Sequence, residues 1–160
     1  MATILAFQNG DVHTGATWTG GVVPGPGDTA VLNGKTLTLT QDWTVDVVTS
    51  RVVDGSIGNG NVLVSANNLT VTADIYAGDS ANGVFNVTEA ATGINGNFYV
   101  VGYVEGGTTN TTIRIGVRNS GTTTSIYITG DCKGGLTTSA YAVYASGNGN
   151  LYITDRKSVV

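Results

Sequence analysis

The sequence has few charged residues, and this scarcity limits the kinds of partner it can serve. Charged residues make up 11% of the 160-residue chain, with seven lysines and arginines against eleven aspartates and glutamates and a formal net charge of −4. A nucleic-acid-binding groove needs a cluster of basic side chains that neutralises phosphates. The composition therefore argues against a nucleic-acid partner.

Cysteine and long hydrophobic runs are equally scarce. The single cysteine, Cys132, cannot form an internal disulfide, and we expect it to be a small buried thiol. No segment approaches the roughly 20 apolar residues of a membrane-spanning helix. The opening residues, MATILAFQNGDVHTG, lack the basic region and apolar run of a signal peptide. We therefore expect no membrane contact and assembly in a cytoplasm, unless a leaderless export route handles the protein.

Helix-forming patterns are missing as well. No stretch longer than a few residues spaces apolar side chains three and four apart among good helix formers. The chain is instead rich in threonine and asparagine, and it has 24 glycines against two prolines. Threonine, valine, isoleucine and tyrosine favour strands, while glycine and asparagine favour tight turns. The composition predicts an all-β protein.

Four segments of the chain resemble one another. They are LTVTADIYAG from Leu69, FYVVGYVEGG from Phe98, IYITGDCKGG from Ile126 and LYIT from Leu151, with starts 29, 28 and 25 residues apart. A looser fifth copy, LTLTQDW, begins at Leu37. A second strand-like stretch follows three of the copies: VFNVT from Val84, TIRIGV from Thr112 and AYAVYA from Ala140.

Repeats of this length with two or three short strands are typical of a parallel β-solenoid, here of about five coils. In such a fold each strand pairs with the equivalent strand of the next coil, about 4.8 Å away. Alternation then places two apolar positions of each copy in one internal column: Leu37 and Leu39, Leu69 and Val71, Phe98 and Val100, Ile126 and Ile128, Leu151 and Ile153. The alternative is a β-sandwich whose short strands are similar by chance.

The end of the chain breaks the repeat. Gly130 follows Thr129, but Thr154 is followed by Asp-Arg-Lys-Ser-Val-Val over 155–160. These residues are what a common short-read sequencing adapter encodes in one frame, GAT CGG AAG AGC GTC GTG, before the stop codon TAG. We interpret 155–160 as translated adapter rather than a native basic terminus. We therefore expect a gene from assembled environmental (metagenomic) sequence, whose natural product continues past Thr154.

The segment before the repeats carries a resemblance. Trp18 to Leu32 reads W-x-G-G-x-V-P-G-x-G-D-x-A-V-L, and its proline–glycine turns and large Trp18 suit a cap on the first coil. This segment resembles the opening of β-helical proteins common in bacteriophage genomes and of some bacterial surface proteins. The glycine-rich units that follow resemble repeats of phage tail-fibre and virion surface proteins, and the resemblance covers most of 15–154.

The resemblance implies a virion component, often trimeric, that decorates particles or contacts host surfaces, and it transfers no site residue. We expect a lead-in and cap over 1–34 and solenoid repeats over 35–154. The expected partners are further copies of the chain, as a trimer, other virion proteins and host-surface glycans. The alternatives are a cell-surface or extracellular adhesin and, less favoured, a fragment of a polysaccharide depolymerase.

Catalysis finds weak support in the residues. Asp74, Tyr103 and Asp131 hold the same place in successive copies, and a ladder would set the two carboxylates about 9.6 Å apart, near the upper limit for an inverting glycosidase. However, aspartate beside glycine is commonly a turn residue, and no arginine or lysine occupies the matching positions. His13, the only histidine, is expected at the surface or in the cap. We therefore predict no enzyme, no catalytic residue, no cofactor and no metal site.

One positive feature is a row of tyrosines. Tyr99, Tyr127 and Tyr152 share an outward position in three copies, and Thr70 holds it in the first. Such a row can stack sugars, form a subunit interface or stiffen the sheet by cross-strand packing. The sequence leaves these three roles open.

Overall fold

The structure is a computed structural model. It describes residues 1–51, 53, 55, 58, 60–63, 67–76, 86–87, 97–100, 104–105, 114–119, 125–129, 132–133, 140–145 and 151–154. Within these residues the regular elements are strands and two short 3-10 turns, η1 (Gly15–Thr17) and η2 (Thr19–Gly21). The expectation of an all-β protein is therefore met.

The strands form four sheets. One sheet has the order β1 (Thr3–Leu5), β3 (Thr29–Val31), β6 (Val47–Thr49), β9 (Ile75–Tyr76), β12 (Val104–Glu105), β15 (Cys132–Lys133). A second has the order β5 (Trp43–Val45), β8 (Leu69–Val71), β11 (Asn97–Val100), β14 (Ser125–Ile128), β17 (Leu151–Ile153). The two smaller sheets are β2 (Gly10–Asp11), β4 (Thr36–Thr38), β7 (Asn61–Leu63) and β10 (Asn86–Val87), β13 (Arg114–Asn119), β16 (Ala140–Ala145).

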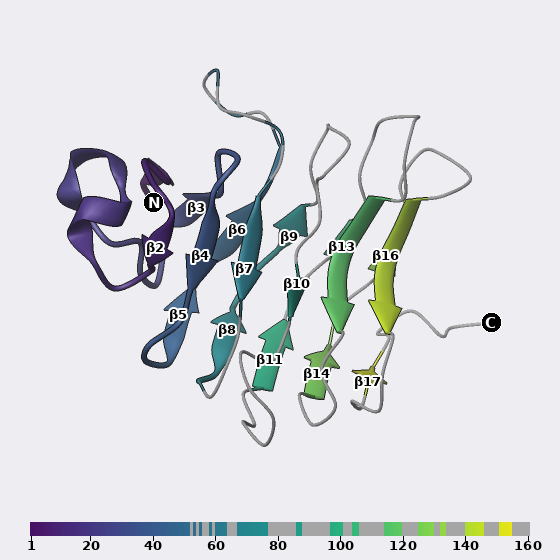
Figure 1. Ribbon diagram of the computed structural model, residues 1–160. Coiled ribbons are helices and arrows are strands. Elements are labelled where there is room, and N and C mark those ends of the chain that lie inside the picture. Colours follow the sequence, from purple (N-terminus) through teal and green to yellow (C-terminus); the bar gives the residue numbers. More distant parts are fainter. Residues whose placement is uncertain are drawn as a thin grey trace.

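Each strand of the five-stranded sheet pairs in parallel with the strand that lies one sequence repeat later. Leu69 is opposite Phe98, Phe98 is opposite Ile126, and Ile126 is opposite Leu151. In Figure 1 these strands stand side by side in chain order, from the N-terminal turns to the C-terminal end. The register predicted for the last four copies is therefore confirmed. Parallel pairing also disagrees with the antiparallel sheets of a β-sandwich.

The second strand-like stretches also pair as the repeat predicts. β10, β13 and β16 come from the three segments beginning at Val84, Thr112 and Ala140, and they form one parallel sheet. The side chains of these strands lie outside the described part of the structure.

The alignment of the first copy was wrong. Leu37 lies in β4, which pairs with β2 and β7, so it belongs to a different sheet from Leu69. The strand opposite β8 is β5, where Trp43 faces Leu69 and Val45 faces Val71. Leu37 and Leu39 are nevertheless buried, because they contribute to the same core from another side.

The core fills the space between the sheets. In β5 and β8 the first and third residues are buried and the middle threonine points outward, as alternation along a strand requires. Ile128 of β14 is also buried, with 1% of its surface exposed. Of the remaining predicted core residues, Phe98, Val100 and Ile126 have side chains outside the described part.

Two predictions about burial were wrong. Leu151 and Ile153 of β17 are 37% and 46% exposed, because β17 is the end strand of its sheet and has a described neighbour on one side, β14. Cys132 is exposed rather than buried, and it lies in β15, the end strand of the six-stranded sheet.

Trp18 closes the core at its N-terminal end. It is 2% exposed, its ring centroid lies 5.9 Å from that of Trp43, and the two planes are tilted by 42°. The Trp18 Nε1–H donates to the Val12 carbonyl at 2.7 Å, and the Trp43 Nε1–H donates to the Pro24 carbonyl at 2.8 Å. Both indole donors are therefore satisfied in the interior, as buried tryptophans require.

The region predicted as a cap also contributes strands. β1, β2 and β3 come from it and join the same sheets as the later strands. The proposed division at residue 34 and the reading of 155–160 as adapter stay predictions, and 155–160 lie outside the described residues.

Candidate functional site

The residues weighed for catalysis are placed only in part. Asp74 lies just before β9, whereas Tyr103 and Asp131 are outside the described residues. The Tyr76 hydroxyl donates to Asp74 Oδ2 at 2.9 Å. Residues two apart in an extended segment share a face, which explains why these two side chains meet.

Asp74 lines a pocket on the outer side of the six-stranded sheet. The pocket has a volume of about 380 Å³ and is lined by Thr29, Val47, Thr49, Arg51, Val53, Asp74 and Tyr76. Successive side chains of a strand point to opposite faces of the sheet, which explains the two lining residues that β6 supplies. Val48 packs into the core, so Val47 and Thr49 on either side of it face outward into the pocket. We call this pocket the Asp74 pocket.

Arg51 brings a positive charge to the same pocket. Its guanidinium carbon lies 5.0 Å from the centre of the Tyr76 ring, within the range of a cation–π contact. The Arg51 N–H donates to Thr49 Oγ1 at 3.1 Å. No basic residue occupies the positions that match Asp74 in the other copies. Arg51 was missed because it comes from another part of the chain. It follows β6, which pairs with β9 so that Thr49 is opposite Tyr76, and this pairing places Arg51 in the pocket that Asp74 lines.

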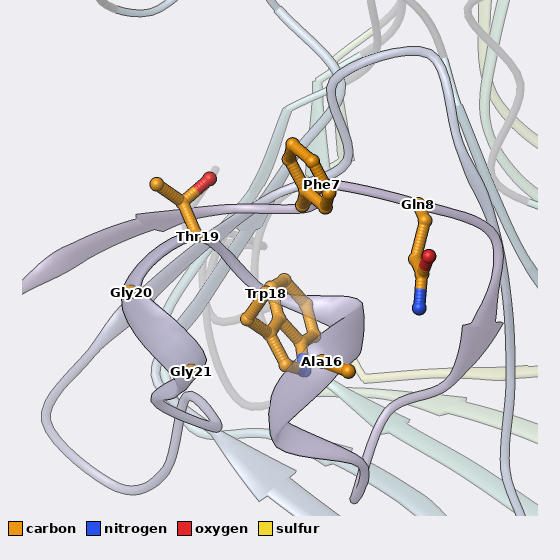
Figure 2. Close-up of a pocket in the computed structure, with 7 residues that line it drawn as sticks. All are labelled: Phe7, Gln8, Ala16, Trp18, Thr19, Gly20 and Gly21. Carbon is orange, nitrogen blue, oxygen red and sulfur yellow. The ribbon is translucent and has the colours of Figure 1, made fainter.

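A second pocket, of about 420 Å³, lies in the region predicted as a cap, and we call it the cap pocket. Figure 2 shows the Phe7 ring above the Trp18 indole in this view, with Gln8 and Thr19 on either side; Ala16, Gly20 and Gly21 complete the lining. Phe7 is 67% exposed, whereas Trp18 forms the buried floor. None of these seven residues carries a charge or a titratable side chain, so the cap pocket offers an apolar surface and an amide but no acid–base group.

His13 joins two turns and is half-buried. Its Nδ1 lies 3.4 Å from Asp11 Oδ1, and its Nε2 lies 3.2 Å from the Asp42 carbonyl oxygen. Burial alone would raise the pKa of Asp11, but hydrogen bonds from the Thr40 hydroxyl and the His13 N–H outweigh it and lower that pKa. These contacts fit the expected place of His13 in the N-terminal region and give it a structural role.

The tyrosine row is set by the strand register. Thr70, Tyr99, Tyr127 and Tyr152 are successive partners across the five-stranded sheet, and Thr44 of β5 extends the row by one strand. The rings of Tyr127 and Tyr152 are stacked with centroids 4.8 Å apart and planes within 6°. The two stacked faces cover each other, so a sugar ring cannot lie between them. The side chain of Tyr99 is outside the described part.

The described residues contain no group of three or more histidine, cysteine, aspartate or glutamate side chains placed to hold a metal ion. They also contain no helix long and apolar enough to span a bilayer.

Comparisons with known proteins add no relative. No family model matches the chain, and neither a curated protein nor a solved structure is significantly similar to it.

Proposed function

We propose that the chain is a parallel β-solenoid that serves as a non-enzymatic structural component of a virus particle, either a bacteriophage tail fibre or a capsid-decorating protein. The observation that supports the solenoid is the parallel register of the five-stranded sheet. Each strand is opposite the equivalent strand of the next sequence repeat, from Trp43 through Leu69 and Phe98 to Leu151. Coil-on-coil pairing of this kind is how solenoids bury a continuous core.

A solenoid suits a particle surface for physical reasons. Its stability adds up coil by coil through nearest-neighbour contacts, and its faces can pack against symmetry-related copies. The carboxylate of Asp74 accepts a hydrogen bond from Tyr76 and shares its pocket with Arg51, an arrangement compatible with a binding or structural role.

The virion assignment is tested by the genes that flank this one on its source DNA. Adjacent capsid, tail or tail-assembly genes would support it. Flanking genes for cell-wall anchoring would overturn it in favour of a bacterial surface adhesin, and flanking genes for polysaccharide degradation would overturn it in favour of a depolymerase.

The proposal includes self-association, with a trimer as the expected state. Charged residues are few, and the end strand β17 exposes Leu151, Tyr152 and Ile153. An exposed strand edge recruits other chains unless it is blocked. Light scattering across a concentration series would show a mass that levels off at a closed oligomer, whereas a monomer at every concentration would contradict this part of the proposal.

A further inference from the structure

We infer that the Asp74 pocket is a binding site for a neutral hexopyranose unit of a glycan, held by Asp74, Arg51 and the threonine hydroxyls. The inference goes beyond the proposed function and does not rest on it, because it concerns one pocket and applies equally to a virion protein, an adhesin or a free protein.

The charges in the pocket favour an uncharged ligand. Arg51 and Asp74 are the charged residues of its lining, so the lining carries one positive and one negative charge and no net formal charge. A phosphate or a uronate would be attracted by the Arg51 guanidinium but repelled by the Asp74 carboxylate. A cation would be attracted by Asp74 but repelled by Arg51. Neither charged ligand gains a net attraction at close range, because like and opposite charges act on it together.

The hydrogen-bonding groups match a sugar. Each sugar hydroxyl donates one hydrogen bond and accepts others, so it needs acceptors and donors side by side. The Asp74 carboxylate is an acceptor, the guanidinium of Arg51 is a planar group of donors, and the hydroxyls of Thr29 and Thr49 serve as either. Hydrogen bonds to the charged members are the stronger ones, which makes them the expected anchors.

The remaining walls match the other face of a sugar ring. Val47 and Val53 give apolar surface for the ring C–H groups, and the pocket volume of about 380 Å³ lies within the range of small-molecule sites. The cap pocket lacks this combination, because it has no charged group among its lining residues.

The polar groups are held in place before a ligand arrives. The Tyr76 hydroxyl fixes Asp74, the Tyr76 ring lies under the Arg51 guanidinium, and the Arg51 backbone N–H binds Thr49. Thr49 is itself 4% exposed. Side chains that are already ordered lose little conformational entropy on binding, so this arrangement favours affinity.

The test is a titration of the 15N-labelled full chain followed by amide chemical shifts. The probes are the methyl glycosides of glucose, galactose and mannose, with glucuronate and inorganic phosphate as charged competitors. We expect at least one neutral glycoside to cause saturable shifts around Val47–Arg51 and Asp74–Tyr76, at millimolar concentrations or below.

The variants separate the pocket from the rest of the chain. Asp74→Asn and Arg51→Gln should each weaken binding roughly tenfold or more, since each removes a charge-assisted hydrogen bond. Asp42→Asn is the matched control, because it removes an aspartate that does not line the pocket, and it should leave the affinity unchanged. Tyr76→Phe keeps the ring beneath Arg51 while removing the hydroxyl that fixes Asp74, and it should weaken binding less.

Three results would overturn the inference. The first is that no neutral glycoside causes localised shifts in the wild-type chain, a measurement that needs no variant to fold. The second is that only glucuronate or phosphate binds, which would make the pocket an anion site. The third is that the shifts gather around Phe7 and Trp18, which would assign the sugar to the cap pocket. The gene-neighbourhood test of the virion proposal is independent of all three.

Discussion

Asp42 and Asn68, 26 residues apart in the sequence, are joined by two hydrogen bonds at the start of the paired strands β5 and β8. The Asn68 N–H donates to Asp42 Oδ1 at 2.7 Å, and Asn68 Nδ2 donates to Asp42 Oδ2 at 3.0 Å. Two other aspartates make similar bonds between paired strands. Asp28, just before β3, accepts a hydrogen bond from the N–H of Ala2, just before β1. Asp46, just after β5, accepts one from the hydroxyl of Thr72, just after β8. Aspartates at strand ends thus tie β5 to β8 at both ends and β1 to β3 at one end.

These aspartates predict loss of stability in acid. Hydrogen bonds from Asn68 lower the pKa of Asp42, and those from Ala2 and Thr72 lower the pKa values of Asp28 and Asp46. A carboxyl group with a lower pKa in the folded state than in the unfolded state stabilises the fold while it is ionised. This stabilisation is complete at a pH above the pKa of the unfolded state, and it is lost as the pH falls through the pKa of the folded state. The melting temperature should therefore decrease when the pH is lowered below about 4.

Thermal melts between neutral pH and pH 3 would measure this fall. Asp42→Asn should melt lower than the wild type at neutral pH, because its amide cannot accept from both Asn68 donors, and it should lose less on acidification. A wild-type melting temperature that stays constant down to pH 3 would contradict the prediction.

The next prediction compares two isoleucines in register on neighbouring strands. Ile128 of β14 is opposite Ile153 of β17, but Ile128 is 1% exposed and Ile153 is 46% exposed. Ile128→Asp should cost more than about 4 kcal/mol of unfolding free energy, because it buries a carboxylate. Ile153→Asp should cost less than about 1 kcal/mol. Equal losses in urea denaturation would show that the burial of the two positions does not differ.

The repeat predicted the register of the later strands because its copies share one pattern of apolar alternation. It failed in the first copy, where Leu37–Leu39 and Trp43–Val45 both read apolar, threonine, apolar. Alternation alone cannot choose between such segments. The structure selects Trp43 for the five-stranded sheet, where its ring packs against Trp18 of the cap. That long-range contact leaves no periodic signal in the sequence.

The sequence identified Asp74 of the Asp74 pocket but not its other polar residues, for a similar reason. The repeat singled out Asp74, because it recurs in a later copy as Asp131. Thr49 ends β6 and Arg51 follows it, and β6 is not part of the aligned copies. Their place beside Asp74 in the pocket therefore depends on how β6 pairs with β9. β6 is in fact the counterpart of β9, since Trp43 is opposite Leu69 and Val48 is opposite Ile75. The first copy as aligned from the sequence ended at Trp43, so it did not reach β6.

Gly60, just before β7, closely approaches Leu32, just after β3, and this contact leaves no room for a larger residue. It has a φ of +149°, and a Cβ built on it would lie 2.3 Å from Leu32 Cβ in the core. Gly60→Ala should therefore cost about 1–3 kcal/mol through overpacking. Gly25→Ala is the matched control, because a Cβ there meets no atom within 4 Å. Chemical denaturation should show the loss in the first variant and a change within about 0.5 kcal/mol in the second. A Gly60→Ala variant as stable as the wild type would contradict the close approach.

The last prediction concerns two buried hydroxyls that differ in their partners. Ser50 is fully buried, and in the described part of the chain its Oγ has no hydrogen-bond partner. Thr17 is equally buried, but its Oγ1 donates to the Asp11 carbonyl at 2.7 Å. An unsatisfied buried polar group costs about 1–3 kcal/mol, whereas a satisfied one contributes about 1 kcal/mol. Ser50→Ala should therefore leave the unfolding free energy unchanged or raise it by about 1 kcal/mol, and Thr17→Val should lower it by a similar amount. A clear loss of stability in Ser50→Ala would show that its hydroxyl has a partner in the folded protein.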